Sequence, residues 1–468
     1  MHCGYVVKVE KLNPHPNADR LLLAEFFGNT TCVSTDIMLD EIGIYFPSDL
    51  QLSLEYCDAN HLCRKDAEGN PDIGYLERDK RNIKPIKLRG EKSDGIFMPL
   101  SSIAFTGANL DDYNVGDIIT VVNGIEICGK YIPRGRNKTC GEGTPRTRKP
   151  HIDIAPLFAQ HKDTEQLAYN LSAFKPEDEI EITLKMHGTS GRTAFVPVAH
   201  PLKQNFIQKL FRRPIHYDYT YDYISGTRRT VCENFEGGFY GSNEFRQQYH
   251  NRFVGKLMKG ETVYYEIVGF THTGQPIMSN GTNKTVGEDF VKQYGDTTIF
   301  SYGCDPQGKQ VVLKKMGEGL YGSVLQDTPQ SDIYVYRMTM TNEDGFTVEY
   351  TPDFMRYRCE QMGVKCVPVL WKGTIPKYPA SMEDDTIAAG EWIKAVAEQH
   401  YDGPDPVGKT HIREGVVVRI INRPTFSAFK HKNWSFKLLE GIIKDTADAP
   451  DMEEAEEIIK ESNEDVEN

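Results

Sequence analysis

Short runs of β-branched and apolar residues, separated by turn-forming residues, fill the first 128 residues of the chain. Examples are Gly4–Val9, Leu21–Ala24 and Asp117–Val122, with Asn, Pro, Gly and Asp between such runs. Short apolar runs bounded by turn formers are typical of β-strands. Because many short strands must cover one core and protect their edges, we expect residues 1–128 to form a compact β-barrel.

Residues 6–34 read VVKVEKLNPHPNADRLLLAEFFGNTTCVS. They resemble the opening of tRNA-binding-type OB modules, in which a strand, a Pro-Asn-Ala-Asp turn and a second strand recur. The resemblance implies an OB-fold-like module over residues 1–128. The alternative is a small β-barrel that serves only as a scaffold.

The formal net charge of −13 argues at first against a nucleic-acid partner. The charge is unevenly distributed, however, because residues 444–468 carry −9 whereas residues 130–149 carry +6. We interpret 444–468 as an acidic tail, either a charged helix or a disordered segment. We interpret 129–154 as a basic linker, which is either solvated or in contact with phosphates.

Residues 155–443 alternate strand-like runs, such as Ile180–Leu184 and Thr262–Val268, with helical stretches such as Thr386–His400. This pattern predicts an α+β domain. No apolar stretch approaches the ~20 residues that cross a bilayer, and the N-terminus lacks the regions of a signal peptide. We therefore expect no membrane partner, a cytoplasmic or other intracellular location, and reduced thiols at the ten cysteines.

The strongest local signal is the run EITLKMHGTSGR, in which a strand ends in Lys185 and Gly188 follows. A nucleophilic lysine must be held rigidly and be partly neutral; a strand end supplies the rigidity, and nearby cations favour the neutral amine. Glycine lets the backbone approach a phosphate closely. Alone the pattern is weak, because many strands end in Lys-x-x-Gly with a lysine that is merely exposed.

Three later segments add carboxylates and cations. The run VYYEIVG places Glu266 among apolar strand residues, and REGVVV places Glu414 before a valine run. Buried carboxylates are costly unless they are paired or used. In FKHKNWSFK, Lys430 and Lys432 share one face of a strand. Two such cations repel each other unless an anion lies between them, and a nucleotide phosphate is the natural candidate.

The chain therefore contains, in this order, KxHGT, a strand glutamate, EGVVV and KxKN. This ordered set is similar to the motifs of the covalent nucleotidyltransferases, which include ligases and capping enzymes. The match is closest to the RNA ligase 2-like branch, which has KxHG where DNA ligases and capping enzymes commonly have KxDG. The segment around Tyr336 resembles that branch's adenine-stacking segment, and His161–Gln166 resembles the lead-in of RNA ligases with an N-terminal OB module. The resemblance implies an ATP-grasp-like ligase domain of antiparallel sheets and helices over 155–443.

The resemblance also implies catalytic roles. Lys185 would attack the α-phosphate of ATP and hold AMP as a phosphoramidate, and His187 would assist near the departing pyrophosphate. Lys430 and Lys432 would brace the α-phosphate and keep Lys185 reactive. Electrostatic positioning would supply most of the rate.

The remaining implied roles concern the nucleoside and the metal. Tyr336 would stack on adenine, with a buried core tyrosine as the alternative; Phe300 is a second aromatic candidate that also suits the core. Glu266 and Glu414 would contact the ribose and organise Mg²⁺ (or Mn²⁺) through its waters, because Mg²⁺ dehydrates reluctantly. A structural ion pair is the alternative for either glutamate.

The sequence departs from the branch in three places. Leu184 stands where an acidic residue often precedes the lysine, and Ala159 and Gln160 stand where a basic residue tends to lie near the lead-in histidine. The long spacing from the adenine segment to EGVVV predicts an inserted helical portion around 352–405. Four basic residues could bind the RNA 5′-phosphate, namely Arg192, Lys209, Arg212 and Arg213. The equal alternative is that they form a solvated basic face.

The implied function is an ATP-dependent RNA ligase that joins 3′-OH and 5′-phosphate ends through lysyl-AMP and an adenylylated 5′-end, in RNA repair or nick sealing. RNA or an RNA/DNA hybrid would be the partner. A capping-type guanylyltransferase is an alternative, but it normally places its OB module after the lysine domain. A non-catalytic OB-type RNA-binding protein is another, although such a protein is not expected to keep all five charged motif residues.

Overall fold

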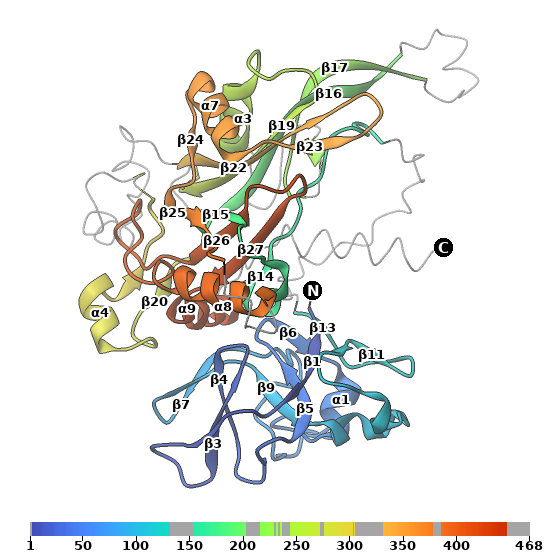
Figure 1. The fold of residues 1–468 in the computed structure, drawn as a ribbon, viewed down its shortest axis with the longest axis vertical. Helices are drawn as coiled ribbons and strands as arrows, with labels where there is room; N and C mark the ends of the chain where they lie inside the picture. Colours follow the sequence, from blue (N-terminus) through green and yellow to red (C-terminus); the bar gives the residue numbers. More distant parts are fainter. Residues whose placement is uncertain are drawn as a thin grey trace. The chain divides into compact units, whose positions relative to one another are not determined.

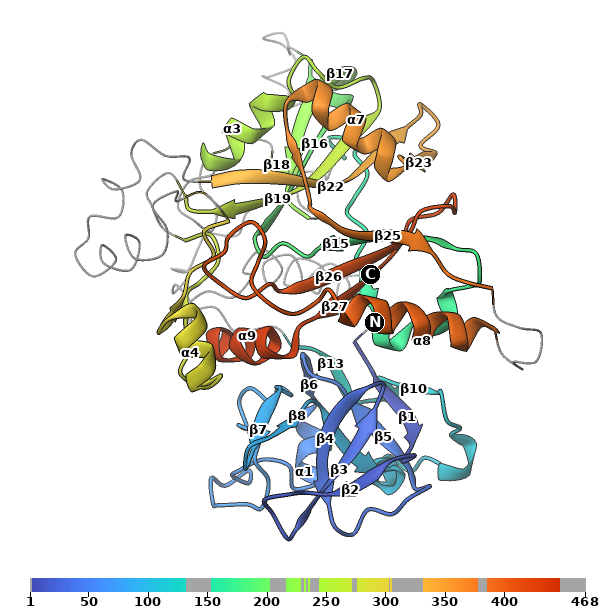
Figure 2. The same ribbon diagram turned by 60° about the vertical axis from the view of Figure 1, so that its left-hand side comes forward.

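The computed structural model describes residues 2–131, 153–202, 216–228, 231–232, 235, 244–271, 276–302, 304, 331–377 and 385–446. These residues divide into two compact units (Figures 1 and 2). The first contains the described residues of Met1–Gly135 and Lys437–Pro450, and the second those of Arg136–Phe436. No helix among the described residues is long and apolar enough to cross a membrane.

The first unit is built from short antiparallel strands. A four-stranded sheet has the order β10-β1-β5-β9, which are Ile118–Ile119, Gly4–Lys8, Ile42–Phe46 and Ile96–Pro99. A three-stranded sheet has the order β2-β3-β4, which are Leu12–Pro14, Leu21–Phe26 and Asn29–Ser34. Three two-stranded sheets complete the unit: β6 with β13 (Leu50–Leu52, Cys128–Lys130), β7 with β8 (Ile86–Leu88, Glu91–Ser93) and β11 with β12 (Val121–Val122, Ile125–Glu126).

The predicted strands of this unit are confirmed, but the closed barrel is not. Strands β1, β3 and the pair β10 and β11 cover the three runs noted in the sequence. The run 117–122 is divided because the carbonyl of Thr120 accepts the N–H groups of Ile127 and Cys128 instead of continuing one ladder. In the part of the unit that the structure describes, the strands form separate sheets around a core that includes Val6 and Ile44.

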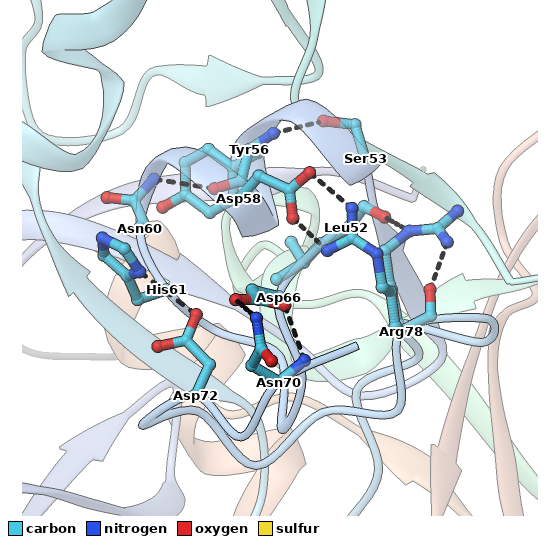
Figure 3. Close-up of polar contacts among 11 residues, drawn as sticks. Leu52, Ser53, Tyr56, Asp58, Asn60, His61, Asp66, Asn70, Asp72 and Arg78 are labelled. Carbon is cyan, nitrogen blue, oxygen red and sulfur yellow. Dashed lines mark hydrogen bonds and ion pairs between the residues drawn. The ribbon is translucent and has the colours of Figure 1, made fainter. Parts of the chain in front are cut away.

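Helix α1 (Leu54–Ala59) and the loop after it are linked by polar contacts (Figure 3), and Tyr56 on the helix and Leu76 in the loop are buried in the core. Arg78 forms a bidentate ion pair with Asp58 at the end of the helix. Within the loop, Asp66 accepts the backbone N–H of Asn70 at 2.8 Å. The loop therefore has a defined conformation although its residues are mostly exposed.

The second unit contains two sheets. A five-stranded sheet has the order β14-β27-β26-β15-β25, which are Glu165–Gln166, Ser427–Lys432, Gly415–Ile420, Glu179–Leu184 and Val369–Thr374. Helix α8 (Asp385–Glu398) covers one face, where Ile182, Val418 and Ile393 are fully buried. Side chains at alternate positions point to the other face, and these include Lys430 and Lys432.

The second sheet has seven strands. Six of them follow the order β18 (Val231–Cys232), β17 (Tyr217–Gly226), β16 (Thr189–Pro201), β19 (Glu261–Gly269), β22 (Ser331–Thr341) and β23 (Thr347–Glu349). The seventh, β24 (Lys365–Cys366), also pairs with β22. Helices α3 (Glu244–Phe253) and α7 (Pro352–Met362) pack on one face, where Phe253 and Met355 are buried (Figure 1). Helix α4 (Glu288–Tyr294) and the paired strands β20 and β21 (Gly281–Thr282, Thr297–Thr298) also belong to the second unit. Helix α9 (Trp434–Thr446) begins in the second unit, and its residues from Lys437 on belong to the first.

The α+β prediction for the second half is confirmed, whereas the helical insertion is not. Helix α8 covers the stretch predicted at 386–400. The segment 352–405, however, also supplies β24 and β25, and β25 pairs directly with β15. This segment is therefore an integral part of both sheets. Helix α9 extends to Thr446 and so includes the first three residues of the predicted acidic tail.

The nine described cysteines are free thiols, as predicted, and Cys140 lies outside the described residues. The later part of the tail and most of the basic linker also lie outside them.

Candidate active site

Lys185 is fixed at the end of a central strand. It directly follows β15, which pairs with β26 through Leu184 and Val416. The backbone N–H of Lys185 donates to the carbonyl of Gly415 at 3.0 Å. The ladder thus continues to the lysine itself, which supplies the rigidity that a nucleophile needs.

Glu414 is the buried centre of the site. Its side chain is 2% exposed, and Oε1 lies 2.9 Å from Nζ of Lys185 and 3.3 Å from Nζ of Lys432. Oε2 lies 3.4 Å from Nδ1 of His187. Burial raises the pKa of the Glu414 carboxyl, but the charges of Lys185 and Lys432 and the contact with His187 outweigh it, so the pKa lies well below its usual range. The carboxylate is therefore ionised and holds two cations together.

Gly415 explains how the two strand ends approach closely enough for these contacts. Residue 415 pairs with Lys432 across β26 and β27. A Cβ atom at Gly415 would lie 2.1 Å from the carbonyl oxygen of His431. Only glycine fits this approach, which brings Glu414 and Lys432 together.

Gly188 has a second close contact, with strand β19. A Cβ atom there would lie 2.3 Å from the carbonyl oxygen of Ile267 and 3.0 Å from Cγ of Glu266. The glycine of KxHG therefore lets the turn after Lys185 pack directly against the strand that carries Glu266. The sequence pattern suggested an approach by phosphate at this glycine; the structure shows an approach by the protein backbone.

We expect Gly188→Ala to destabilise the protein by about 1–3 kcal/mol. We also expect it to lower the rate of the nucleotide attachment that the sequence resemblance implies for Lys185 by roughly 100-fold, because the turn must move. Thermal denaturation and a labelling assay measure the two effects. Gly129→Ala is a matched control, since its Cβ would meet the end of the Glu126 side chain at 3.3 Å, and that side chain can move aside. Equal rates in the two variants would contradict this account.

His187 is held by aromatic side chains. Its ring makes edge-to-face contacts with Phe300 and Phe436 at centroid distances of 4.7 and 4.9 Å. Its backbone N–H donates to the hydroxyl of Tyr302 at 2.7 Å. Phe300 is 2% exposed, so it belongs to this packing and presents no free face to a base. Tyr302 is also buried and has a positive φ of 47°, a costly conformation that is most common at functional sites.

Tyr302→Phe should slow the nucleotide attachment that the sequence resemblance implies for Lys185 roughly 10-fold, because it removes the hydroxyl that accepts the backbone N–H of His187 while preserving the ring packing. The attachment rate at saturating ATP measures this effect. Tyr249→Phe, on helix α3, removes an equally buried hydroxyl, which donates to Ser331 at 2.8 Å. We expect that control to retain the wild-type rate; an equal loss in both would show a general packing effect.

The predicted nucleoside residues lie on the seven-stranded sheet. Tyr264 pairs with Arg337 and Tyr265 with Val335, so Tyr336 is an extra residue on β22. A bulge of this kind redirects side chains near functional sites. Burial and then the charge of Glu266 raise the pKa of the Tyr336 hydroxyl well above its usual value. The strand register also places them close together, because Glu266 pairs with Tyr334, two residues before Tyr336.

His161 completes this end of the site. Its Nδ1 lies 3.1 Å from the Tyr336 hydroxyl, and the two rings meet edge to face at 5.7 Å. Burial, followed by the charge of Arg228, lowers the pKa of His161 to about 3. His161 is therefore neutral near pH 7. The edge of Tyr336 is occupied by this histidine, so any stacking on adenine would use its face.

Sequence reasoning missed Arg228. It follows β17, and Nη2 lies 2.6 Å from Oδ1 of Asp163 in the lead-in. No basic residue precedes His161 at positions 159 and 160, but Arg228 brings a cation to that place from 67 residues further along the chain. The pattern TRRT gave a local cue. The position of Arg228 beside the lead-in is seen only from its ion pair with Asp163 and from its carbonyl, which accepts the backbone N–H of His161 at 3.3 Å.

Arg192 does not lie where a 5′-phosphate could reach it. Its side chain is 2% exposed, and it donates to the carbonyls of Thr227, Phe158 and Ala159 at 2.9, 3.1 and 2.7 Å. Its role is to fix the lead-in against the sheet. The other predicted phosphate-binding cations, Lys209, Arg212 and Arg213, lie outside the described residues.

Lys432 contacts Glu414, and Lys430 lies two residues earlier on the same face of β27, opposite Val417 and half-buried. Within the described residues no group of three or more His, Cys, Asp or Glu side chains is arranged to hold a metal directly. One buried oxygen does suit an indirect site, because Oε2 of Glu414 has only the ion-pair contact with Nδ1 of His187 at 3.4 Å and accepts no hydrogen bond of good geometry from the described part of the chain. A water on a divalent cation could donate to it.

No family model and no curated protein matches the chain. Among solved structures it is similar to the RNA ligase of Naegleria gruberi. An arginine variant of that ligase with ATP and manganese has 16% identity and a TM-score of 0.53, over 96% of this chain and 100% of that one. The same ligase with PPi has 15% identity and a TM-score of 0.52, over 96% of this chain and 100% of that one. A lysine variant with AMP and manganese has 16% identity and a TM-score of 0.52, over 93% of this chain and 97% of that one. The two chains therefore share a fold over nearly their whole length.

Proposed function

We propose that the protein is an ATP-dependent RNA ligase of the RNA ligase 2-like branch. The observation that carries the proposal is that two motifs meet at the buried carboxylate of a third: Lys185 and His187 of KxHG and Lys432 of KxKN all lie at Glu414 of EGVVV. An ion cluster at a strand end with one partly exposed lysine suits nucleophilic chemistry on an anion.

The similar fold supports this proposal. Variants of the Naegleria gruberi ligase have been solved with substitutions at a lysine, a glutamate, a second glutamate and a second lysine, in that order along its chain. Lys185, Glu266, Glu414 and Lys430 occur in the same order here. Those structures contain ATP or AMP with manganese, so we infer ATP and a divalent cation for this chain.

In the first proposed step, Nζ of Lys185, which is partly exposed, gives up a proton to the solvent and attacks the α-phosphorus of ATP. The P–N bond forms, the bond to the β-phosphate oxygen breaks, and pyrophosphate leaves. When ATP binds, its phosphates would compete with Glu414 for Lys185 and Lys432, so these cations would meet the charge of the α-phosphate. His187 would lie beside the leaving group, with its ring orientation set by Phe300 and Phe436.

A divalent cation would add positive charge next to the phosphates. Glu414 through Oε2, and Glu266 from the neighbouring strand, are the carboxylates that would hold its waters. Glu266 and Tyr336 would receive the ribose and the base. Neutral His161 would fix the Tyr336 hydroxyl, so the ring presents a constant face.

In the later steps a 5′-phosphate oxygen of RNA attacks the lysyl-AMP phosphorus and the P–N bond breaks. A 3′-OH then attacks the 5′-phosphorus and AMP leaves. We propose an OB-fold-like module at 1–128, a basic linker at 129–154 and an acidic tail after the adenylation domain. RNA repair or nick sealing is the process that this reaction would serve.

A sealing assay tests the substrate class. Nicked duplexes are prepared in which the 3′-OH strand, the 5′-phosphate strand and the bridging strand are each RNA or DNA in turn. We expect sealing when the strands that meet at the nick are RNA. Sealing of all-DNA nicks at an equal rate, or of no nick despite lysyl-AMP formation, would refute the RNA ligase assignment.

A further inference from the structure

Strands β16 and β17 of the second unit form a two-stranded ribbon that extends past β19 (Figure 1). Residues 189–194 of β16 pair with both β17 and β19, whereas residues 195–201 pair with β17 alone. Segment 154–158 covers one face of the ribbon, where Val196 and Val198 are buried together with Phe158. The opposite face has a different composition, and it is the basis of the inference below.

That opposite face carries a row of four tyrosines, because alternate residues of a strand share one face. The tyrosine row consists of Tyr217, Tyr219, Tyr221 and Tyr223 on β17. At its inner end, Tyr223 stacks on Phe195 with the ring centres 4.5 Å apart, and both pack against the core that includes Phe253 of α3. Further out, Tyr217 and Tyr221 are half-buried and Tyr219 is 45% exposed. The row therefore leads from the core of the unit to its surface.

Contacts with other segments fix the outer rings of the row. The hydroxyl of Tyr219 donates to the carbonyl of Asp153 at 3.0 Å, and that of Tyr221 lies 3.5 Å from Oε1 of Glu343. Nζ of Lys259 lies 4.7 Å from the centre of the Tyr221 ring, which places a cation beside the row. Rings that are held in place before binding lose little conformational entropy when a ligand binds.

The outer edge of β16 beside the row does not suit the addition of a strand from a protein partner. Strand addition needs main-chain hydrogen bonds along an edge. The N–H of Ala199 points to this edge and donates to the carbonyl of Ile154 at 2.8 Å. Residues 197 and 201 face the same edge by the alternation of the strand, and both are prolines, which have no N–H. A partner would therefore bind the face of the ribbon rather than its edge.

We propose that the tyrosine row binds single-stranded RNA, whose unpaired bases stack on the exposed ring of Tyr219 and on the rings beside it. Exposed aromatic side chains on a sheet are platforms for unstacked bases. Over residues 195–201 and 217–223 the ribbon contributes no charged side chain to this face, because its charged residues are at the other alternate positions. In the sequence between the two strands, residues 203–215 include four Lys or Arg and no Asp or Glu, a composition that attracts a polyanion. The choice of RNA rests on the proposed function.

The test is the affinity of the full chain for a single-stranded RNA of about 12 nucleotides, measured over a series of salt concentrations. The RNA carries a 5′-hydroxyl, so that binding is measured without transfer of AMP to the RNA. Tyr219→Leu should lower the affinity roughly 10-fold, because it removes a stacking surface. The slope of log affinity against log salt should not change, since no phosphate contact is lost, and lysyl-AMP formation from ATP should be unchanged.

Two variants serve as controls. Tyr219→Phe loses the contact with Asp153 but keeps the ring, so it should bind RNA like the wild type. Tyr357→Leu removes a tyrosine of α7 that is 54% exposed in the same unit but lies outside the row, and it should also bind normally. An unchanged affinity in Tyr219→Leu, an equal loss in either control, or a changed salt slope would overturn the proposal. So would a dimer that Tyr219→Leu dissociates without loss of RNA affinity, because the row would then bind a second copy of the chain.

A second measurement needs no variant. RNA that contains 5-iodouridine, a photoreactive base that crosslinks to aromatic rings, is irradiated with the wild-type protein, and the labelled peptide is mapped. We expect label on the peptide that contains residues 217–223, and label only on other peptides would contradict the proposal. Absence of lysyl-AMP in the wild type would instead refute the proposed function, and both RNA-binding measurements could still be made.

Discussion

Lys185→Ala should abolish covalent attachment of AMP to the protein, by at least about 1,000-fold, because the variant lacks the amine that forms the phosphoramidate. Sealing of 5′-phosphorylated RNA should disappear with it. The variant should, however, still seal RNA that already carries AMP on its 5′-end, since that step does not use the lysine as a nucleophile. Gel analysis of both substrates measures the two activities.

The fold should survive this substitution. Lys185 is 23% exposed, and Glu414 would keep its contact with Lys432. A variant that retains its melting temperature but loses both activities would show that Lys185 acts in the final step as well. Retained AMP attachment would refute the assignment of the nucleophile.

Glu414→Gln has the second largest expected effect, and it acts on stability as well as on activity. The substitution leaves Lys185 and Lys432 facing a neutral amide at a buried position. Removing one partner from a buried ion cluster costs about 3–5 kcal/mol. We expect the free energy of unfolding to fall by about that amount, and AMP attachment to fall more than 100-fold. Urea denaturation and the labelling assay measure these effects.

The pH dependence of stability gives an independent check. The pKa of Glu414 is lower in the folded protein than its ordinary value of 4.5, so the folded state favours the ionised form. This contribution to stability is fully present above pH 4.5 and is lost as the pH falls below that value. Glu414→Gln should remove the part of the acid-induced loss of folding stability that comes from the protonation of Glu414. The exposed Glu360 on α7 offers a control, Glu360→Gln, that should retain the wild-type pH profile.

The strand ends of the site could be predicted from the sequence because their information is local. Each strand end has its own sequence pattern: a β-run ends in Lys185, an apolar strand contains Glu266, and a valine run follows Glu414. Antiparallel pairing then places the ends of β15, β26 and β27 together. The two-residue period of a strand places Lys430 and Lys432 on one face, and both lie in β27.

Other features depend on contacts between distant segments, and no local pattern encodes them. Tyr302 contacts His187 across 115 residues, and Arg228 reaches the lead-in from the end of β17. Arg192 looked like a phosphate ligand because charge on a strand is usually exposed, but the sheet buries it under the lead-in. The segment 352–405 was predicted to be an insertion because the spacing from Tyr336 to Glu414 is long, but spacing does not reveal that the short edge strand β25 within it pairs with β15.

The most direct test of the proposed nucleotidyltransferase chemistry is to incubate the wild-type protein with α-labelled ATP or GTP and a divalent cation, denature it, and map the labelled peptide. We predict label from ATP, attached to the peptide that contains Lys185, and absent after pyrophosphate is added in excess. Label from GTP alone would favour a capping-type guanylyltransferase. Label on another residue, or none from either nucleotide, would contradict the account.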